Sequence, residues 1–178
     1  FFFKQKTAYE IYQCDWSSDV CSSDLYSDTS YINLQSQEAN YYGSQSLWNN
    51  TQPTSSVFSL GTYGWVNQSS INYIAYLFAS CPGVSKVGTF TLSGSSVNVD
   101  CGFTNGARFV LMKLTSGSAN WWVLDSTRGI NTGNDPVLWM NLTDAETSSY
   151  DILDPYSPGF IADAATLASG NYIYLAIA

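Results

Sequence analysis

The chain has 178 residues, of which 11% are charged and 16% are aromatic, and its formal net charge is −8. Its six lysines and arginines are scattered, so they suit neither a nucleic-acid groove nor a basic membrane-binding patch. No apolar run approaches the roughly 20 residues that span a bilayer. The lack of histidine excludes Ser-His-Asp and Cys-His catalysis and the commonest zinc ligand.

The first 25 residues differ from the rest of the chain. They contain no Gly and no Pro, whereas the remainder holds all 13 Gly and all 5 Pro, and they show no sustained apolar period. Over essentially its whole length this string resembles the conceptual translation of a sequencing-library adapter. We therefore expect residues 1–25 to be a non-native segment, disordered or poorly packed, and we give no functional weight to Cys14 and Cys21.

Three short patterns occur twice in the same order, which indicates an internal repeat. They are N-L-x-x-x-E, S-x-x-F and N-Y-I. They start at Asn33 and Asn141, at Ser55 and Ser157, and at Asn72 and Asn171. The first set has no counterpart of residues 86–125. The patterns predict a truncated first repeat over 26–80, a Cys-Pro-Gly turn, and a complete second repeat over 84–178.

Short apolar or alternating runs, separated by Ser/Gly turns, predict strands in the second repeat. We expect strands at 87–92, 97–101, 108–114, 121–124 and 137–142, and a closing strand that includes 172–177. The run 108–114 is nearly all apolar, which is typical of a central strand covered on both faces. The closing strand should place Tyr172, Tyr174 and Ala176 on one face.

The region that follows the fifth strand favours one helical turn within 142–150, because Thr143 is a fair N-cap and Glu146 lies three residues on. Everything else is typical of β structure. Many short strands at close spacing predict an all-β fold, an antiparallel sandwich of the jelly-roll type.

Four carboxylates cluster at Asp144, Glu146, Asp151 and Asp154. They could supply the acid and base of a glycosidase or the oxygen ligands of a calcium ion. The spacing matches no EF-hand loop, so we favour a third interpretation, a solvated loop of capping and turn residues. The sequence therefore predicts no catalytic residue, no metal site and no cofactor.

Two further groups of residues are candidates for contacts with a ligand. Asp125 and Arg128 lie three apart across a turn, where they could touch a ligand or, as we prefer, form a loop clasp. Trp121, Trp122 and Trp139 could stack on sugar rings. Trp121 and Trp122 are adjacent on a strand and point to opposite faces, so at least one of them should belong to the core.

Cys81 and Cys101 are the cysteines outside the N-terminal segment. They could close a disulfide, but nothing in the sequence indicates an oxidising compartment. We favour two separate, small side chains that are buried or half-buried, and the sequence leaves the question of pairing open.

Over roughly residues 30–178, and most strongly from residue 76 onward, the chain resembles a domain of unknown function common in tail-associated and other virion proteins of marine phages. The segments that carry the resemblance are Tyr76–Ser80, Pro82–Gly88, Val99–Thr104, Gly106–Leu111, Trp121–Val123, Asp125–Gly129, Gly133–Pro136, Ala145–Glu146 and Tyr172–Ala178. As an ensemble these segments are specific, whereas each one alone is weak. The resemblance supplies no catalytic residues to transfer.

The resemblance implies a phage virion structural module, in a tail fibre or tail-associated protein, with a lectin-like sandwich. It would be assembled in the bacterial cytoplasm and would contact other virion proteins, copies of itself or a host surface glycan. It implies no enzyme, no nucleic-acid partner and no membrane insertion. The alternatives are a carbohydrate-binding module and a polysaccharide-degrading, glycosidase-like enzyme.

Overall fold

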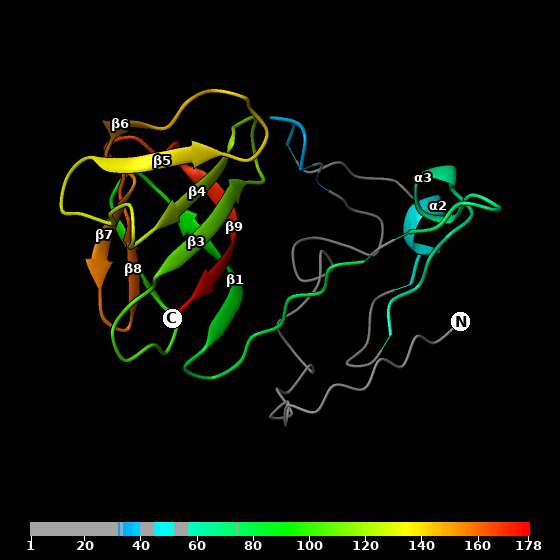
Figure 1. Cartoon of the computed structure of the whole chain (residues 1–178), viewed down its shortest axis with the longest axis horizontal. Helices are drawn as coiled ribbons and strands as arrows, with labels where there is room; N and C mark the ends of the chain where they lie inside the picture. The colour runs from blue at the N-terminus through cyan, green and yellow to red at the C-terminus, as the bar shows by residue number, and fades with distance from the viewer. Residues whose placement is uncertain (1–31, 33, 40–44, 52–56, 74) are drawn as a thin grey trace.

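The computed structural model describes residues 32, 34–39, 45–51, 57–73 and 75–178. Two short helices, α2 (Gln45–Trp48) and α3 (Gly64–Asn67), lie together, apart from the strands (Figure 1). None of the described helices is long and apolar enough to cross a membrane. The predicted non-native segment 1–25 lies outside the described residues, as does part of the predicted first repeat.

Nine strands follow in the described part of the chain, and they form two antiparallel sheets (Figure 1). The larger sheet has the order β1-β9-β3-β4-β5-β6, and the smaller one has the order β2-β8-β7. The strands are β1 (Ser85–Leu92), β2 (Val97–Asp100), β3 (Phe109–Leu114), β4 (Trp121–Asp125), β5 (Asp135–Trp139), β6 (Thr147–Tyr150), β7 (Leu153–Tyr156), β8 (Gly159–Ala162) and β9 (Gly170–Ile177). The predicted antiparallel β-sandwich is confirmed.

The core lies between the two sheets and is rich in aromatic rings. Phe90 stacks on Tyr172 with ring centroids 4.9 Å apart, and Phe160 meets Tyr174 edge to face at 5.3 Å. Tyr172, Tyr174 and Ala176 are all buried, as the alternation of the closing strand predicts. The predicted central position of 108–114 is also confirmed, because β3 lies between β9 and β4.

Strands β7 and β8 were not expected from the sequence. Pro155 stands within β7, and Pro158 and Gly159 stand at the start of β8, so this stretch reads as a turn. β7 is an edge strand of the smaller sheet, where a proline that cannot donate to a ladder is tolerated. Residues that are typical of turns therefore form strands here.

The helical turn expected within 142–150 is wrong. The chain is irregular up to Glu146 and then forms β6, which pairs with β5 through Val137 and Thr147 and through Asp135 and Tyr150. Pairing with a neighbouring strand here outweighs the helix-capping signal, which is a weak local preference.

Cys81 and Cys101 are separate free thiols. Cys101 is buried, and burial raises the pKa of its thiol to about 11. Cys81 lies in the turn before β1, where its backbone N–H donates to the carbonyl of Ser85 at 2.8 Å. Both cysteines are small packing residues in this structure.

Candidate functional site

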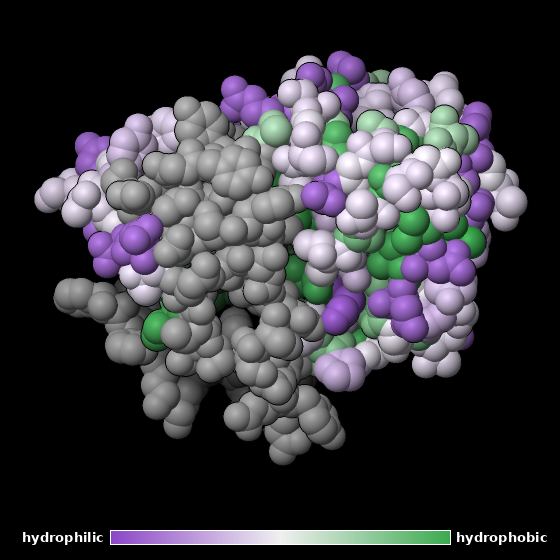
Figure 2. All heavy atoms as spheres, turned by 180° about the vertical axis from the view of Figure 1, so that it is seen from behind, coloured by the Kyte–Doolittle hydropathy of each residue, from purple (hydrophilic) through white to green (hydrophobic). Residues whose placement is uncertain are grey.

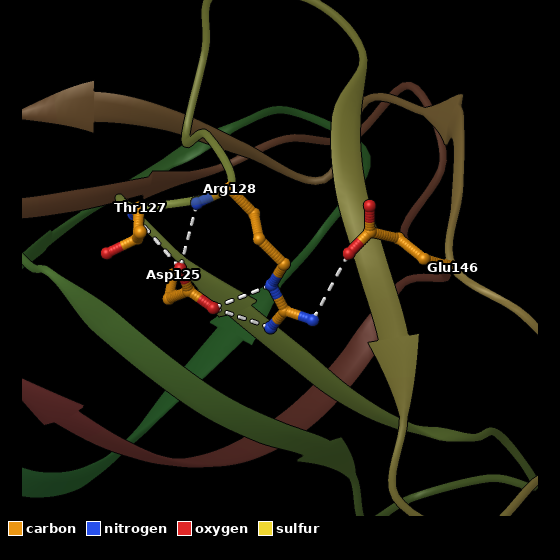
Figure 3. Close-up of polar contacts among 4 residues, drawn as sticks. All are labelled: Asp125, Thr127, Arg128 and Glu146. Atoms are coloured by element: carbon orange, nitrogen blue, oxygen red, sulfur yellow. Dashed lines mark hydrogen bonds and ion pairs between the residues drawn. The ribbon is translucent and has the colours of Figure 1, made fainter.

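The turn after β4 is organised by Asp125 (Figure 3). Its Oδ1 atom accepts hydrogen bonds from the backbone N–H groups of Thr127 and Arg128, each at 2.9 Å. The Asp125 carbonyl accepts a third from Gly129 N–H at 3.0 Å. An aspartate that begins a turn in this way holds the next residues in a compact loop.

Arg128 folds back onto the same carboxylate and lies between Asp125 and Glu146 (Figure 3). Its Nε donates to Asp125 Oδ2 at 2.7 Å, and its Nη2 approaches the same oxygen at 2.6 Å. Nη1 reaches Glu146 Oε2 at 3.4 Å. The three side chains thus link the β4–β5 loop to the segment just before β6.

The pKa of Asp125 reflects these contacts. Burial raises the pKa, but hydrogen bonds from the Arg128 backbone and guanidinium and the Arg128 charge lower it more, so it lies below the usual 3.8. A lowered carboxyl pKa stabilises the fold above the unfolded value, and this contribution is lost as the pH falls through the folded pKa.

We predict that Arg128→Leu lowers the free energy of unfolding by about 1 kcal/mol at neutral pH, because a charge-assisted contact is lost. The loss should shrink well below pH 3.8, where Asp125 becomes protonated. Urea unfolding of Arg128→Leu and the wild type, at neutral pH and at the acid pH, measures this loss in unfolding free energy. Glu146→Gln is the control, since its contact is longer and its side chain is 44% exposed. An equal loss at both pH values would contradict the interpretation.

The tryptophans named as candidate glycan contacts occupy two different environments. Trp121 is only 7% exposed, so little of its ring is available to a ligand. Trp122 and Trp139 are cross-strand partners on β4 and β5, with ring centroids 5.7 Å apart. Tyr150 on β6 meets both of these rings edge to face, at 5.8 Å each.

This aromatic cluster, Trp122, Trp139 and Tyr150, is half-buried and packs against the core. Trp139 Nε1 is buried and has no hydrogen-bond partner in the described structure. The three rings lie on β4, β5 and β6 and are only partly exposed, so part of the cluster is available for contacts.

The four candidate carboxylates do not share one arrangement. Asp144 and Glu146 are exposed, whereas Asp151 and Asp154 are half-buried and each has one buried carboxylate oxygen without a partner in the described structure. Burial, followed by the charges of Asp163, Asp154 and Asp135, raises the pKa of Asp151. Among the described residues there is no group of three or more His, Cys, Asp or Glu placed to hold a metal ion.

Asp135 is the buried carboxylate that the sequence did not single out as a site. It is fully buried, and its Oδ2 accepts the backbone N–H groups of Ile152 and Leu153 at 2.9 Å each. Its Oδ1 accepts the N–H of Asn131, also at 2.9 Å. Burial raises its pKa despite these hydrogen bonds. Asp135 thus joins β5 to the start of β7, which is a structural role.

Lys113 on β3 is the other charged side chain that is fully buried in the described structure. Its Nζ donates to the carbonyls of Ala119 at 2.6 Å and Gln37 at 3.0 Å, and Ala119 N–H donates to Gln37 as well. Burial lowers the pKa of Lys113 to about 8, although the nearby charge of Glu38 opposes this. The amine fastens residues 34–39 to the β3–β4 turn.

The lowered pKa gives Lys113 a measurable alkaline signature. Between pH 8 and 10.5 the unfolded chain keeps the proton that folded Lys113 has lost, so stability rises with pH. We predict that the unfolding free energy of the wild type, minus that of Lys113→Met, increases by about 3 kcal/mol over this range. The raised pKa of Cys101 lowers stability as the pH rises. It does so in both proteins, so its contribution cancels in the comparison. Parallel pH curves would contradict the assignment.

The fold and these contacts define an antiparallel β-sandwich protein in which Arg128 bonds to two carboxylates, and Asp135 and Lys113 bond to the backbone. The chain belongs to the family described as a domain of unknown function, DUF7483, whose model matches residues 8–178. The match runs through both predicted repeats in one stretch and includes residues 8–25. No curated protein and no solved structure matches the chain.

Proposed function

We propose that this chain is a non-catalytic structural module of a phage virion, part of a tail fibre or tail-associated protein. The observation that carries the non-catalytic part is that Arg128 bonds to both Asp125 and Glu146. Charged groups of the kind that act on substrates in enzymes here hold two loops of the sandwich together. A rigid surface for contacts is what a structural module needs.

The chemistry of the surface supports the same proposal. Most of the coloured surface in Figure 2 is pale, near the middle of the hydropathy scale, and strongly hydrophilic residues are scattered. Interfaces between proteins are depleted in charged residues and enriched in aromatic ones, and this chain has both properties. Its partners would be other virion proteins, copies of itself and the host surface, without nucleic acid, a cofactor or membrane insertion.

The assignment to phage and tail rests on the resemblance of roughly residues 30–178, which is strongest from residue 76 onward. Immunogold electron microscopy of purified phage particles, with antibodies raised against this chain, tests it. We expect gold on tails or fibres. Gold on capsids would contradict the tail assignment, and protein that stays in the lysate while particles are unlabelled would contradict the virion role.

A carbohydrate-binding module is the second candidate, because the half-exposed rings of Trp122 and Trp139 lie on neighbouring strands. A glycan array with the wild type and Trp139→Ala tests it. Saturable binding that the variant loses supports glycan recognition, and the absence of saturable binding removes it. Release of reducing ends from capsular polysaccharide would instead favour the glycosidase-like alternative.

A further inference from the structure

A long stretch before the sandwich is uncharged and exposes apolar side chains. No charged residue stands between Glu38 and Lys86. Near its end Ile71 is 52% exposed, Tyr76 79%, Leu77 57% and Phe78 52%. Soluble proteins rarely leave such apolar residues side by side in water unless the patch has a partner.

This stretch also has the sequence of a β-strand. Residues 72–79 read NYIAYLFA, and residues 171–178 read NYIYLAIA. The second segment forms most of β9, which pairs with β1 on one side and β3 on the other. The described residues of 72–79 form no strand in the structure, so the segment has the composition of a paired strand without the pairing.

The nearest sheet edge belongs to β1, the terminal strand of the larger sheet. Among the described residues, contacts cover only its beginning: Cys81 bridges to Ser85, and Ser80 Oγ bonds to both the N–H and the carbonyl of Val87. Backbone groups of alternate residues face the same side, so those of Thr89 and Thr91 face this edge as well. No backbone partner for them occurs there in the described part of the chain.

We propose that two copies of this chain associate by pairing residues 75–79 of one copy with the free edge of β1 in the other. A second copy fits because neither surface carries a charge, apart from Lys86 at the start of β1. Two chains of net charge −8 can meet there without bringing carboxylates together. At Val87 the backbone groups of this edge bond to the Ser80 side chain and not to the backbone of a neighbouring strand.

The pairing would use the mode in which an extended segment adds a strand to an exposed sheet edge. Backbone hydrogen bonds along β1 would give affinity, and the apolar side chains of Leu77 and its neighbours would be covered. This inference is independent of the virion proposal: a chain that is absent from phage particles would still form the dimer.

Light scattering coupled to size exclusion, over a range of concentrations, tests the proposal on the full chain. We expect a dimer whose dissociation constant rises at least about tenfold, equivalent to about 1.4 kcal/mol, in Leu77→Asp and in Thr89→Pro. Thr89→Pro removes an N–H that the sheet itself does not use. Met140→Asp is the matched control, since Met140 is 47% exposed but lies just beyond β5.

Hydrogen exchange locates the interface. The amides of Thr89 and Thr91 should exchange more slowly at concentrations at which the wild type is a dimer. A monomeric wild type, a dimer that Leu77→Asp leaves intact, or a dimer without protection in β1 would each overturn the proposal. Near-UV circular dichroism reports whether Thr89→Pro folds, and if it does not, Leu77→Asp and the exchange data decide.

Discussion

Replacing Asp135 with alanine will lower the free energy of unfolding by about 4 kcal/mol. The substitution leaves three backbone N–H groups without an acceptor, those of Asn131, Ile152 and Leu153. Each buried group that loses its partner costs about 1–3 kcal/mol. The raised pKa of Asp135 reflects the cost of burying the carboxyl, and this offsets part of the loss. Urea denaturation followed by tryptophan fluorescence measures the change.

Two variants provide the comparison. Asp135→Asn keeps the shape and one carbonyl oxygen but turns an N–H₂ group toward backbone donors, so we expect a loss between that of alanine and zero. Asp144→Ala, at an exposed position, should stay within about 0.5 kcal/mol of the wild type. An Asp135→Ala variant as stable as Asp144→Ala would show that the three amides find other partners.

Strands β1 to β5 and β9 and the class of fold could be predicted because their signals are local. Alternation alone assigns Tyr172, Tyr174 and Ala176 to one face, and the structure buries all three. The same rule places Trp121 and Trp122 on opposite faces of β4. Their different environments, one buried and the other packed with Trp139 and Tyr150, follow from it.

The structural roles of Asp135 and Lys113 could not be predicted, because each side chain also bonds to groups that lie far away along the chain. Asp135 bonds to residues 17 and 18 positions later, and Lys113 bonds to Gln37, 76 positions earlier. No spacing rule links such positions. A lysine near the end of the largely apolar run 108–114 looks like an interruption of a buried strand until its partners are known.

The contacts that Arg128 makes with Asp125 and Glu146 could be predicted only in part. Asp125 and Arg128 are three residues apart, so their contact is within reach of sequence reasoning. The approach of Glu146 depends on how β5 and β6 pair, and the expected helical turn would have placed it differently. The family match adds no residue roles, so the arrangement of these groups rests on the structure alone.

Replacing Gly159 with alanine will lower the free energy of unfolding by about 3 kcal/mol or more. A Cβ atom at this position would collide with the carbonyl oxygen of Val99 and would lie 3.0 Å from the Cys101 nitrogen, both on or beside β2. Gly159 begins β8, and its carbonyl accepts Ala107 N–H at 2.8 Å. The backbone cannot retreat without breaking this contact and the pairing of β2 with β8.

Gly64→Ala is the matched control, because only Gln68 Oε1, at 3.8 Å, comes near its Cβ position, and alanine suits a helix better than glycine. Thermal unfolding of both variants, followed by near-UV circular dichroism, compares them. We expect Gly64→Ala to melt with the wild type and Gly159→Ala to melt well below it. If the two variants melt together, β8 is free to shift away from β2, and the smaller sheet is less tightly fixed than its close contacts require.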